Sequence, residues 1–183
     1  MQLNFGSYHI IPIHENDGWT ICNFAVANED RLKHYFPGTL KQNLTPDLSH
    51  IFVEKKVKQF ETKEEFLFSL RENESNKLIG LVYIKAVDWK TKQGEFAYCI
   101  DYSVEGKGVM TEAVKQLSDY AFETLSLETL QIISHKSNIG SIKVAKNNNF
   151  FWIKTLKNEF TPLEGKPSNM ELYELYKKIE SLL

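Results

Sequence analysis

The hydrophobic pattern of this chain changes from a strand period to a long helical period at a short glycine-containing segment. Before that segment, three apolar stretches separated by polar turns are typical of β-strands, at residues 66–71, 77–87 and 93–101. After it, apolar residues recur every three or four positions, as on one face of a helix; they are Val109, Ala113, Leu117, Tyr120 and Ala121. A meander of antiparallel strands that leads into a long amphipathic helix predicts a mixed α/β sheet.

The last third of the chain alternates between the two periods. A strand is predicted at 129–134, a helix at 139–146 and a further strand at 150–155. Strands joined through helices pair in parallel by crossover connections, so we expect parallel pairing in this half. Residues 169–176 are ambiguous, because their apolar spacing mildly favours a helix.

The first third is predicted as one strand and several helices. The strand covers residues 8–13, and helices follow at 19–27 and 29–35. Thr45 and Pro46 fit the N-cap and first position of another helix. Its apolar side is expected to carry Leu48, Ile51, Phe52 and Val57.

Composition narrows the class of protein. With 183 residues, 42% of them hydrophobic and 13% aromatic, the chain is expected to fold as one domain over residues 1–183. A net charge of −2 argues against direct nucleic-acid or membrane binding. Cys22 and Cys99 lie in apolar runs and are interpreted as core, and the five histidines show no metal-ligand spacing. No signal segment or membrane span is evident, so a soluble cytoplasmic protein is expected.

The segment at the change of period has the composition of a phosphate site. Gly106 and Gly108 allow backbone conformations with positive φ and close approach of a ligand. The first free N–H groups of the following helix would then face a pyrophosphate. Taken alone, the two glycines are weak evidence, because an ordinary strand-to-helix turn also contains such residues, and neither Walker nor dinucleotide-fold spacing is present.

Two motifs read together resemble a known family. The loop Glu105-Gly106-Lys107-Gly108-Val109-Met110 resembles the Q/R-x-x-G-x-G/A loop of the GCN5-related N-acetyltransferase (GNAT) superfamily. Thirty residues after Gly108, the segment 138–150 is similar to the N-x-x-S-x-x-V-x-x-K-x-G-F pattern of its RimJ/RimL-type ribosomal-protein branch. Glu105, Met110, Asn147 and Asn149 depart from the family pattern, the last mildly, since Asn tolerates the left-handed conformation that Gly would take.

The resemblance implies a fold and a co-substrate. The fold would be a GNAT domain with a mixed sheet of six to seven strands flanked by helices, in which residues 169–176 form the last strand. The co-substrate would be acetyl-CoA, without a metal. Its binding residues would be Tyr98, Cys99, Ile100, Val104, Glu105, Gly106, Lys107, Gly108, Val109, Met110, Thr111, Asn138 and Ser141. The backbone of residues 98–100 would pair with the pantetheine arm as an added strand does.

The resemblance also suggests the catalytic groups. The position at which many members carry a general-acid tyrosine is Ala145, so Ser141 is expected to hydrogen-bond the leaving thiolate. A helix hydroxyl bonded to its own preceding turn is the alternative for Ser141. Asn138 would anchor pantetheine, or cap the helix that follows it. Glu95 is the candidate general base through a raised pKa, and a solvent-facing strand residue is equally consistent with its position.

Several functions stay open at this point. The leading hypothesis is acetyl transfer to a protein or peptide N-terminal amine by direct attack in a ternary complex. The alternatives are a small-molecule amine acceptor such as a polyamine or antibiotic, a catalytically inactive CoA-binding module, and a purely structural protein. Acceptor choice is expected to depend on residues 19–43 and 158–169. Monomer and homodimer are both compatible with the sequence.

Overall fold

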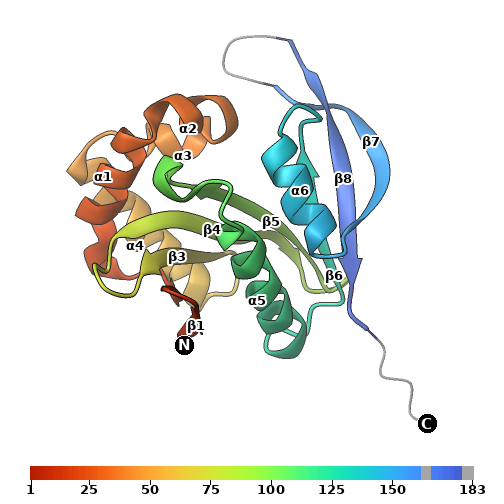
Figure 1. Ribbon diagram of the computed structural model, residues 1–183, viewed down its shortest axis with the longest axis horizontal. Coiled ribbons are helices and arrows are strands. Elements are labelled where there is room, and N and C mark those ends of the chain that lie inside the picture. Colours follow the sequence, from red (N-terminus) through yellow and green to blue (C-terminus); the bar gives the residue numbers. More distant parts are fainter. Residues whose placement is uncertain (162–165, 179–183) are drawn as a thin grey trace.

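An eight-stranded sheet forms the centre of the protein, as seen in a computed structural model that describes residues 1–161 and 166–178 (Figure 1). The strand order is β1-β2-β3-β4-β5-β6-β8-β7. The strands are β1 (Leu3–Phe5), β2 (Tyr8–Pro12), β3 (Phe66–Glu72), β4 (Leu78–Asp88), β5 (Gln93–Ile100), β6 (Thr129–Ser134), β7 (Phe151–Phe160) and β8 (Ser168–Tyr176). The helices are α1 (Gly18–Ala27), α2 (Glu29–Tyr35), α3 (Pro37–Lys41), α4 (Pro46–Glu61), α5 (Val109–Glu123) and α6 (Ile139–Asn147).

The N-terminal part of the sheet is an antiparallel meander, as predicted. β2 to β5 pair in chain order, and their bounds agree closely with the periods in the sequence. The predicted six to seven strands become eight because β1 forms a hairpin with β2 around Gly6, whose φ is 50°. A three-residue strand is too short to display alternation. The five-residue helix α3 was not predicted either.

The C-terminal part is mixed. β5 and β6 are parallel, as predicted, but β6 and β7 are not neighbours. β8 lies between them and is antiparallel to both. The prediction of a strand at the C-terminal end is confirmed, against the helical spacing of its apolar residues. The parallel pairing expected for the 150–155 strand is wrong, because the returning strand fills the place beside β6.

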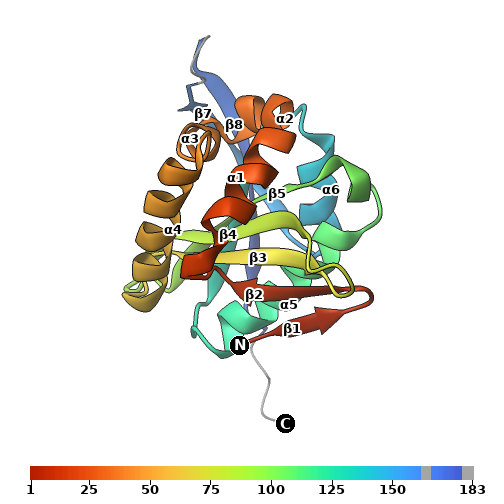
Figure 2. The ribbon, with the colours of Figure 1, turned by 90° about the vertical axis from the view of Figure 1, so that its left-hand side faces the viewer.

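Helices cover both faces of the sheet (Figure 2). The helices α1 to α4 pack on one face, where Ile21, Leu32 and Phe52 meet Leu81 and Cys99. On the other face, α5 and α6 pack through apolar residues at helical spacing, among them Val109, Ala113, Leu117 and Val144. Burial of these two apolar layers is the main force that holds helices and sheet together.

The buried face of α4 differs from the predicted one. Thr45 does cap the helix, since its Oγ1 accepts a hydrogen bond from the Leu48 N–H at 3.4 Å. However, the side chains of Leu48 and Ile51 are exposed, while Ser49 and Val53 are buried beside Phe52. The buried stripe is thus rotated by one position. Because the buried face includes the polar residue Ser49, the spacing of apolar residues did not identify it.

The sheet opens in its middle, between β5 and β6. Their pairing ends at Phe96 and Ile132. Beyond this point β5 continues along β4 as far as Ile100, while β6 continues along β8 as far as Ser134. The two strands therefore diverge and leave a wedge between them, and residues from both helical layers meet at this wedge.

Candidate active site

The glycine loop between β5 and α5 has the open backbone that its sequence predicts. Gly106 and Gly108 have φ values of 74° and 75°, in the left-handed region. Gly108 is the N-cap residue of α5. A Cβ atom built on either glycine would meet no heavy atom within 4 Å, so the space in front of this backbone is empty of protein. Free N–H groups at the start of α5 and open space beside them suit an anionic group.

A groove of about 600 Å³ leads away from this loop and is called the loop groove below. It runs between the glycine loop, the end of β5 and the start of α6. The predicted coenzyme-binding residues that line it are Tyr98, Cys99, Ile100, Val104, Glu105, Gly106, Gly108, Val109, Met110, Thr111, Asn138 and Ser141. Lys107 belongs to the same prediction but does not line the groove. Residues that are up to 43 positions apart in sequence thus share one surface.

The backbone of β5 is partly free along this groove. The Asp101 N–H donates to the Ile79 carbonyl at 2.7 Å, on the β4 side. Because backbone groups alternate sides along a strand, those of Tyr98 and Ile100 face the wedge, while those of Cys99 face β4. The Ile100 carbonyl accepts a hydrogen bond from Arg31 Nη1 at 2.7 Å. Of residues 98–100, which are expected to pair with pantetheine through their backbone, Tyr98 and Ile100 are therefore the ones on the correct side of the strand.

Three polar side chains gather where α6 begins. Asn138 caps the helix, because its Oδ1 accepts from the Ser141 N–H at 3.1 Å. The Ser141 Oγ lies 2.9 Å from the Tyr98 hydroxyl, which also donates to the Ser141 carbonyl at 3.2 Å. Burial raises the pKa of Tyr98, so this phenol remains protonated at neutral pH. Ser141 thus has a hydroxyl partner outside its own helix.

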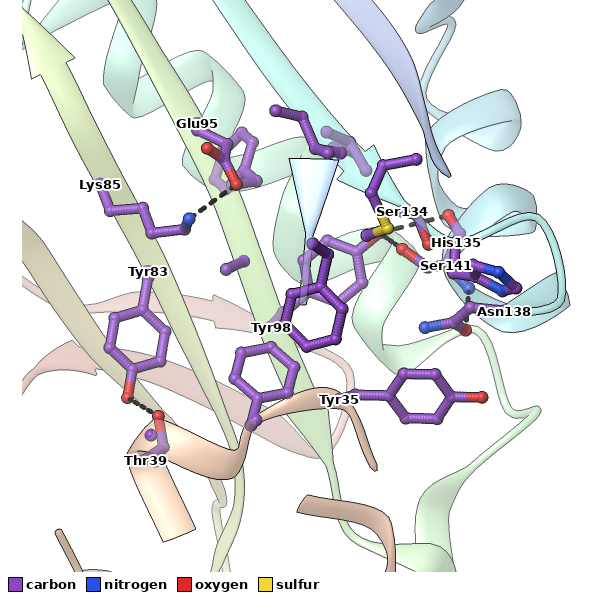
Figure 3. Close-up of a pocket in the computed structure, with 18 of the residues that line it drawn as sticks. Tyr35, Thr39, Tyr83, Lys85, Glu95, Tyr98, Ser134, His135, Asn138 and Ser141 are labelled. Carbon is purple, nitrogen blue, oxygen red and sulfur yellow. Dashed lines mark hydrogen bonds and ion pairs between the residues drawn. The ribbon is translucent and has the colours of Figure 1, made fainter. Parts of the chain in front are cut away.

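A second cavity, of about 770 Å³, lies on the other side of these residues and is called the α2–α3 cavity below (Figure 3). Part of its wall comes from α2 and α3, within residues 19–43, and part from β5, β6 and β8. The residues that line both spaces are Tyr35, Phe36, Tyr98, Ser137, Asn138 and Ser141. The loop groove and the α2–α3 cavity therefore meet at Ser141 and Tyr98.

Glu95 lines the α2–α3 cavity but stands apart from Ser141 (Figure 3). Its side chain shares a sheet face with Cys99, whereas Tyr98 belongs to the opposite face. The Glu95 carboxylate is 2.8 Å from Lys85 Nζ, and its side chain is 16% exposed. The structure therefore brings Ser141, Tyr98 and Asn138 together and pairs Glu95 with a lysine. Sequence reasoning missed Lys85, because nothing local to it marks the partner across the β4–β5 pair.

Comparison with known proteins identifies the family. Residues 9–150 match the family described as "Acetyltransferase (GNAT) domain". The chain belongs to the GNAT acetyltransferase family. The acetyltransferase PseH of Campylobacter jejuni is 31% identical to this GNAT domain over 137 residues, which cover 70% of the chain and 82% of PseH. The probable N-acetyltransferase YjcK of Bacillus subtilis is 33% identical over 93 residues, or 50% of this chain and 51% of YjcK. The chain thus spans only about half the length of that curated relative.

A solved structure shares the fold over nearly the whole domain. It is the ribosomal L7/L12 α-N-protein acetyltransferase RimL in complex with coenzyme A, with a TM-score of 0.89 and 14% identity. The match covers 96% of this GNAT domain and 98% of RimL. Because the identity is only 14%, the comparison shows that the two proteins share a fold and no more than that.

The structure accommodates two departures from the family pattern, Met110 and Asn149. Met110 is 6% exposed, and its Cε lies 3.5 Å from the place where Gly80 would carry a Cβ. The missing side chain on β4 thus leaves room for the larger one on α5. Asn149 takes φ 61°, the left-handed conformation expected for it.

The cysteines of this GNAT domain are core residues, as predicted. Cys22 and Cys99 are both buried and free. Burial raises the pKa of the Cys99 thiol to about 12, so it stays protonated although its residue lines the loop groove. A protonated, buried thiol is a poor nucleophile.

Within residues 1–161 and 166–178, no three His, Cys, Asp or Glu side chains gather as metal ligands would. The same part of the chain contains no helix that is both long and apolar enough to cross a bilayer.

Proposed function

We propose that this domain transfers the acetyl group of acetyl-CoA to the α-amino group of a protein or peptide N-terminus. The observation that carries the proposal is the meeting of two spaces at Ser141 and Tyr98. One space ends at an open backbone cradle for an anion, and the other opens between α2, α3 and the sheet. A donor in the first and an amine in the second would react without a covalent enzyme intermediate.

The loop groove is assigned to the coenzyme. Its diphosphate would accept hydrogen bonds from N–H groups around Gly106, Gly108 and Thr111, where a side chain on either glycine would intrude. The pantetheine arm would lie along the backbone of Tyr98 and the Ile100 N–H, because the Ile100 carbonyl already accepts a hydrogen bond from Arg31. The side-chain oxygen of Asn138 is used in capping α6, which leaves its NH₂ group to donate to the arm.

The chemistry is a direct acyl transfer. The amine nitrogen attacks the thioester carbonyl carbon, the carbon–sulfur bond breaks, the sulfur takes a proton and the amine loses one. Ser141 would donate a hydrogen bond to the departing sulfur, while the protonated Cys99 takes no covalent part. Glu95 would receive the amine proton, directly or through water, and it would have to do so beside Lys85.

The acceptor class is argued from the cavity and from the relatives. A space of about 770 Å³ is large enough for the first residues of a peptide. RimL, which shares the fold, is described as an α-N-protein acetyltransferase. Residues 158–161 and 166–169 of the other expected specificity segment are described, and residues 162–165 of it lie outside the described residues.

The deciding experiment is an acceptor panel followed by thiol release. Acetyl-CoA is offered with peptides that vary in their N-terminal residue, with the same peptides blocked at the α-amine, and with polyamines and aminoglycosides. Turnover of unblocked peptides only is the expected result. Turnover of small amines alone would replace the peptide by a small-molecule acceptor. Coenzyme binding without any turnover would make the domain a binding module.

A further inference from the structure

One side chain from outside the glycine loop reaches into it. Arg31 of α2 forms an ion pair with the Glu105 carboxylate and donates to the Ile100 carbonyl at 2.7 Å. Its guanidinium also lies over the Tyr102 ring, 4.3 Å from the ring centroid. The Arg31 side chain is 16% exposed, against 53% for Glu105. Three contacts fix one cation at the edge of the loop groove.

The charges of the loop explain why a cation is needed there. Glu105 lines the loop groove directly beside Gly106, so it carries a negative charge next to the place assigned to a diphosphate. Lys107, the lysine of the same loop, does not line the groove. Like charges within a few ångströms repel each other, and the repulsion is stronger where water is partly excluded.

We propose that Arg31 cancels the charge of Glu105 toward the coenzyme diphosphate and thereby makes α2 part of the coenzyme site. An exposed ion pair would contribute little to affinity. Arg31 differs because it is mostly buried and also holds the β5 backbone. The inference rests on the proposed coenzyme site.

The position of Arg31 on α2 gives the pair a second role. Tyr35 lies one helical turn further along, and Phe36 follows it. Both residues line the loop groove and the α2–α3 cavity. The helix whose Arg31 neutralises Glu105 therefore also lines the junction of the two spaces. The positions of the coenzyme and of the acceptor both depend on α2.

The test measures binding of CoA by isothermal titration calorimetry to four proteins. They are the wild type, Arg31→Met, Glu105→Gln and the double variant. Arg31→Met leaves a bare carboxylate beside the diphosphate and should weaken CoA binding about tenfold, in a manner that fades at high salt. Glu105→Gln should tighten binding by up to about fivefold. The double variant lacks both charges and should return to within about threefold of the wild type.

A matched control removes the same charge elsewhere. Lys92 pairs with Glu128 at the surface, with side chains 50% and 58% exposed, so Lys92→Met should leave CoA affinity unchanged. S-acetylpantetheine has no phosphate, and its affinity should not respond to either charge substitution. Circular dichroism verifies that each variant is folded.

Each contrary result has a distinct meaning. Arg31→Met with wild-type affinity, or a double variant as weak as Arg31→Met, overturns the charge-cancelling role. Weaker binding by Glu105→Gln, which keeps Arg31 in place, overturns it even where Arg31→Met does not fold. A wild-type protein that does not bind CoA contradicts the proposed function itself.

Discussion

The loop groove and the α2–α3 cavity share six residues but are constructed differently. The groove owes its cradle to one continuous backbone segment, with two glycines at positive φ and the start of α5. The α2–α3 cavity takes side chains from four helices and several strands, held by pairs such as Lys85–Glu95 and Thr39–Tyr83. A site made of backbone tolerates side-chain change and preserves one ligand. The ligand of a site made of side chains depends on the identity of those side chains.

The largest effect is expected where the backbone site is broken. Gly108→Asp places a side chain at φ 75° and a carboxylate where N–H groups are free, so acetyl-CoA binding should be abolished in calorimetry. Gly38→Asp is the matched control, because Gly38 lines only the α2–α3 cavity of the two spaces. Unchanged coenzyme affinity in a folded Gly108→Asp protein would remove the phosphate cradle.

The junction of the two spaces is tested by Ser141→Ala. Loss of one donor to the developing thiolate should lower kcat by between about tenfold and a thousandfold, while CoA affinity changes little. The measurement is single-turnover thiol release, where chemistry limits the rate. Ser75→Ala is the control, since the Ser75 hydroxyl donates to Glu72 Oε2 at 2.7 Å and lines neither space. Wild-type kcat in Ser141→Ala would assign departure of the sulfur to water or to Tyr98.

A smaller effect is expected from the side-chain-built cavity. Glu95→Gln removes the candidate proton acceptor and should lower kcat/KM for the amine by about tenfold, most strongly at low pH where the amine is protonated. Acetyl-CoA affinity should stay the same, because Glu95 does not line the loop groove. The pH–rate profile is the decisive measurement. A profile unaltered by the substitution would show that the amine arrives deprotonated or that another group accepts its proton.

The smallest effect is expected from Cys99, which lines the groove without reacting. Cys99→Ala should leave kcat within about twofold, since its thiol remains protonated. Stability gives a finer test. The folded pKa, about 12, lies above the ordinary value of 9.0, so the folded state holds the proton more tightly. The stabilisation is complete below about pH 9 and is lost as pH rises toward 12, by at most about 1.4 kcal/mol per pH unit.

Urea unfolding at pH 8, 9 and 10 measures this loss. The free energy of unfolding of the wild type should fall with pH more steeply than that of Cys99→Ala. Parallel curves would contradict a protonated buried thiol at this position.

Local backbone rules explain what the sequence could predict. The glycine loop, the face of α5 and the left-handed Asn149 each depend on a few neighbouring residues, and the structure contains all three. Long-range packing explains what it could not. The insertion of β8 beside β6, the Lys85 partner of Glu95 and the reach of Arg31 to Glu105 join residues up to 74 positions apart. The local spacing of apolar residues carries no information on such contacts. The buried face of α4 was predicted wrongly for another reason, which is that it contains the polar residue Ser49.

The divergence of β5 from β6 has a consequence for association with other chains. Unpaired strand edges at the rim of a sheet invite strands from other molecules, and proteins guard them with charge or cover. Here the free edge of β5 lines the loop groove, which Tyr35 and Phe36 at the end of α2 and Ile139 and Val144 of α6 also line. The free edge of β6 lines the α2–α3 cavity. Both edges thus lie in recesses between the helical layers, which suit a narrow extended ligand. The domain thereby keeps open hydrogen-bonding backbone for a ligand without the aggregation hazard that an outer edge would carry.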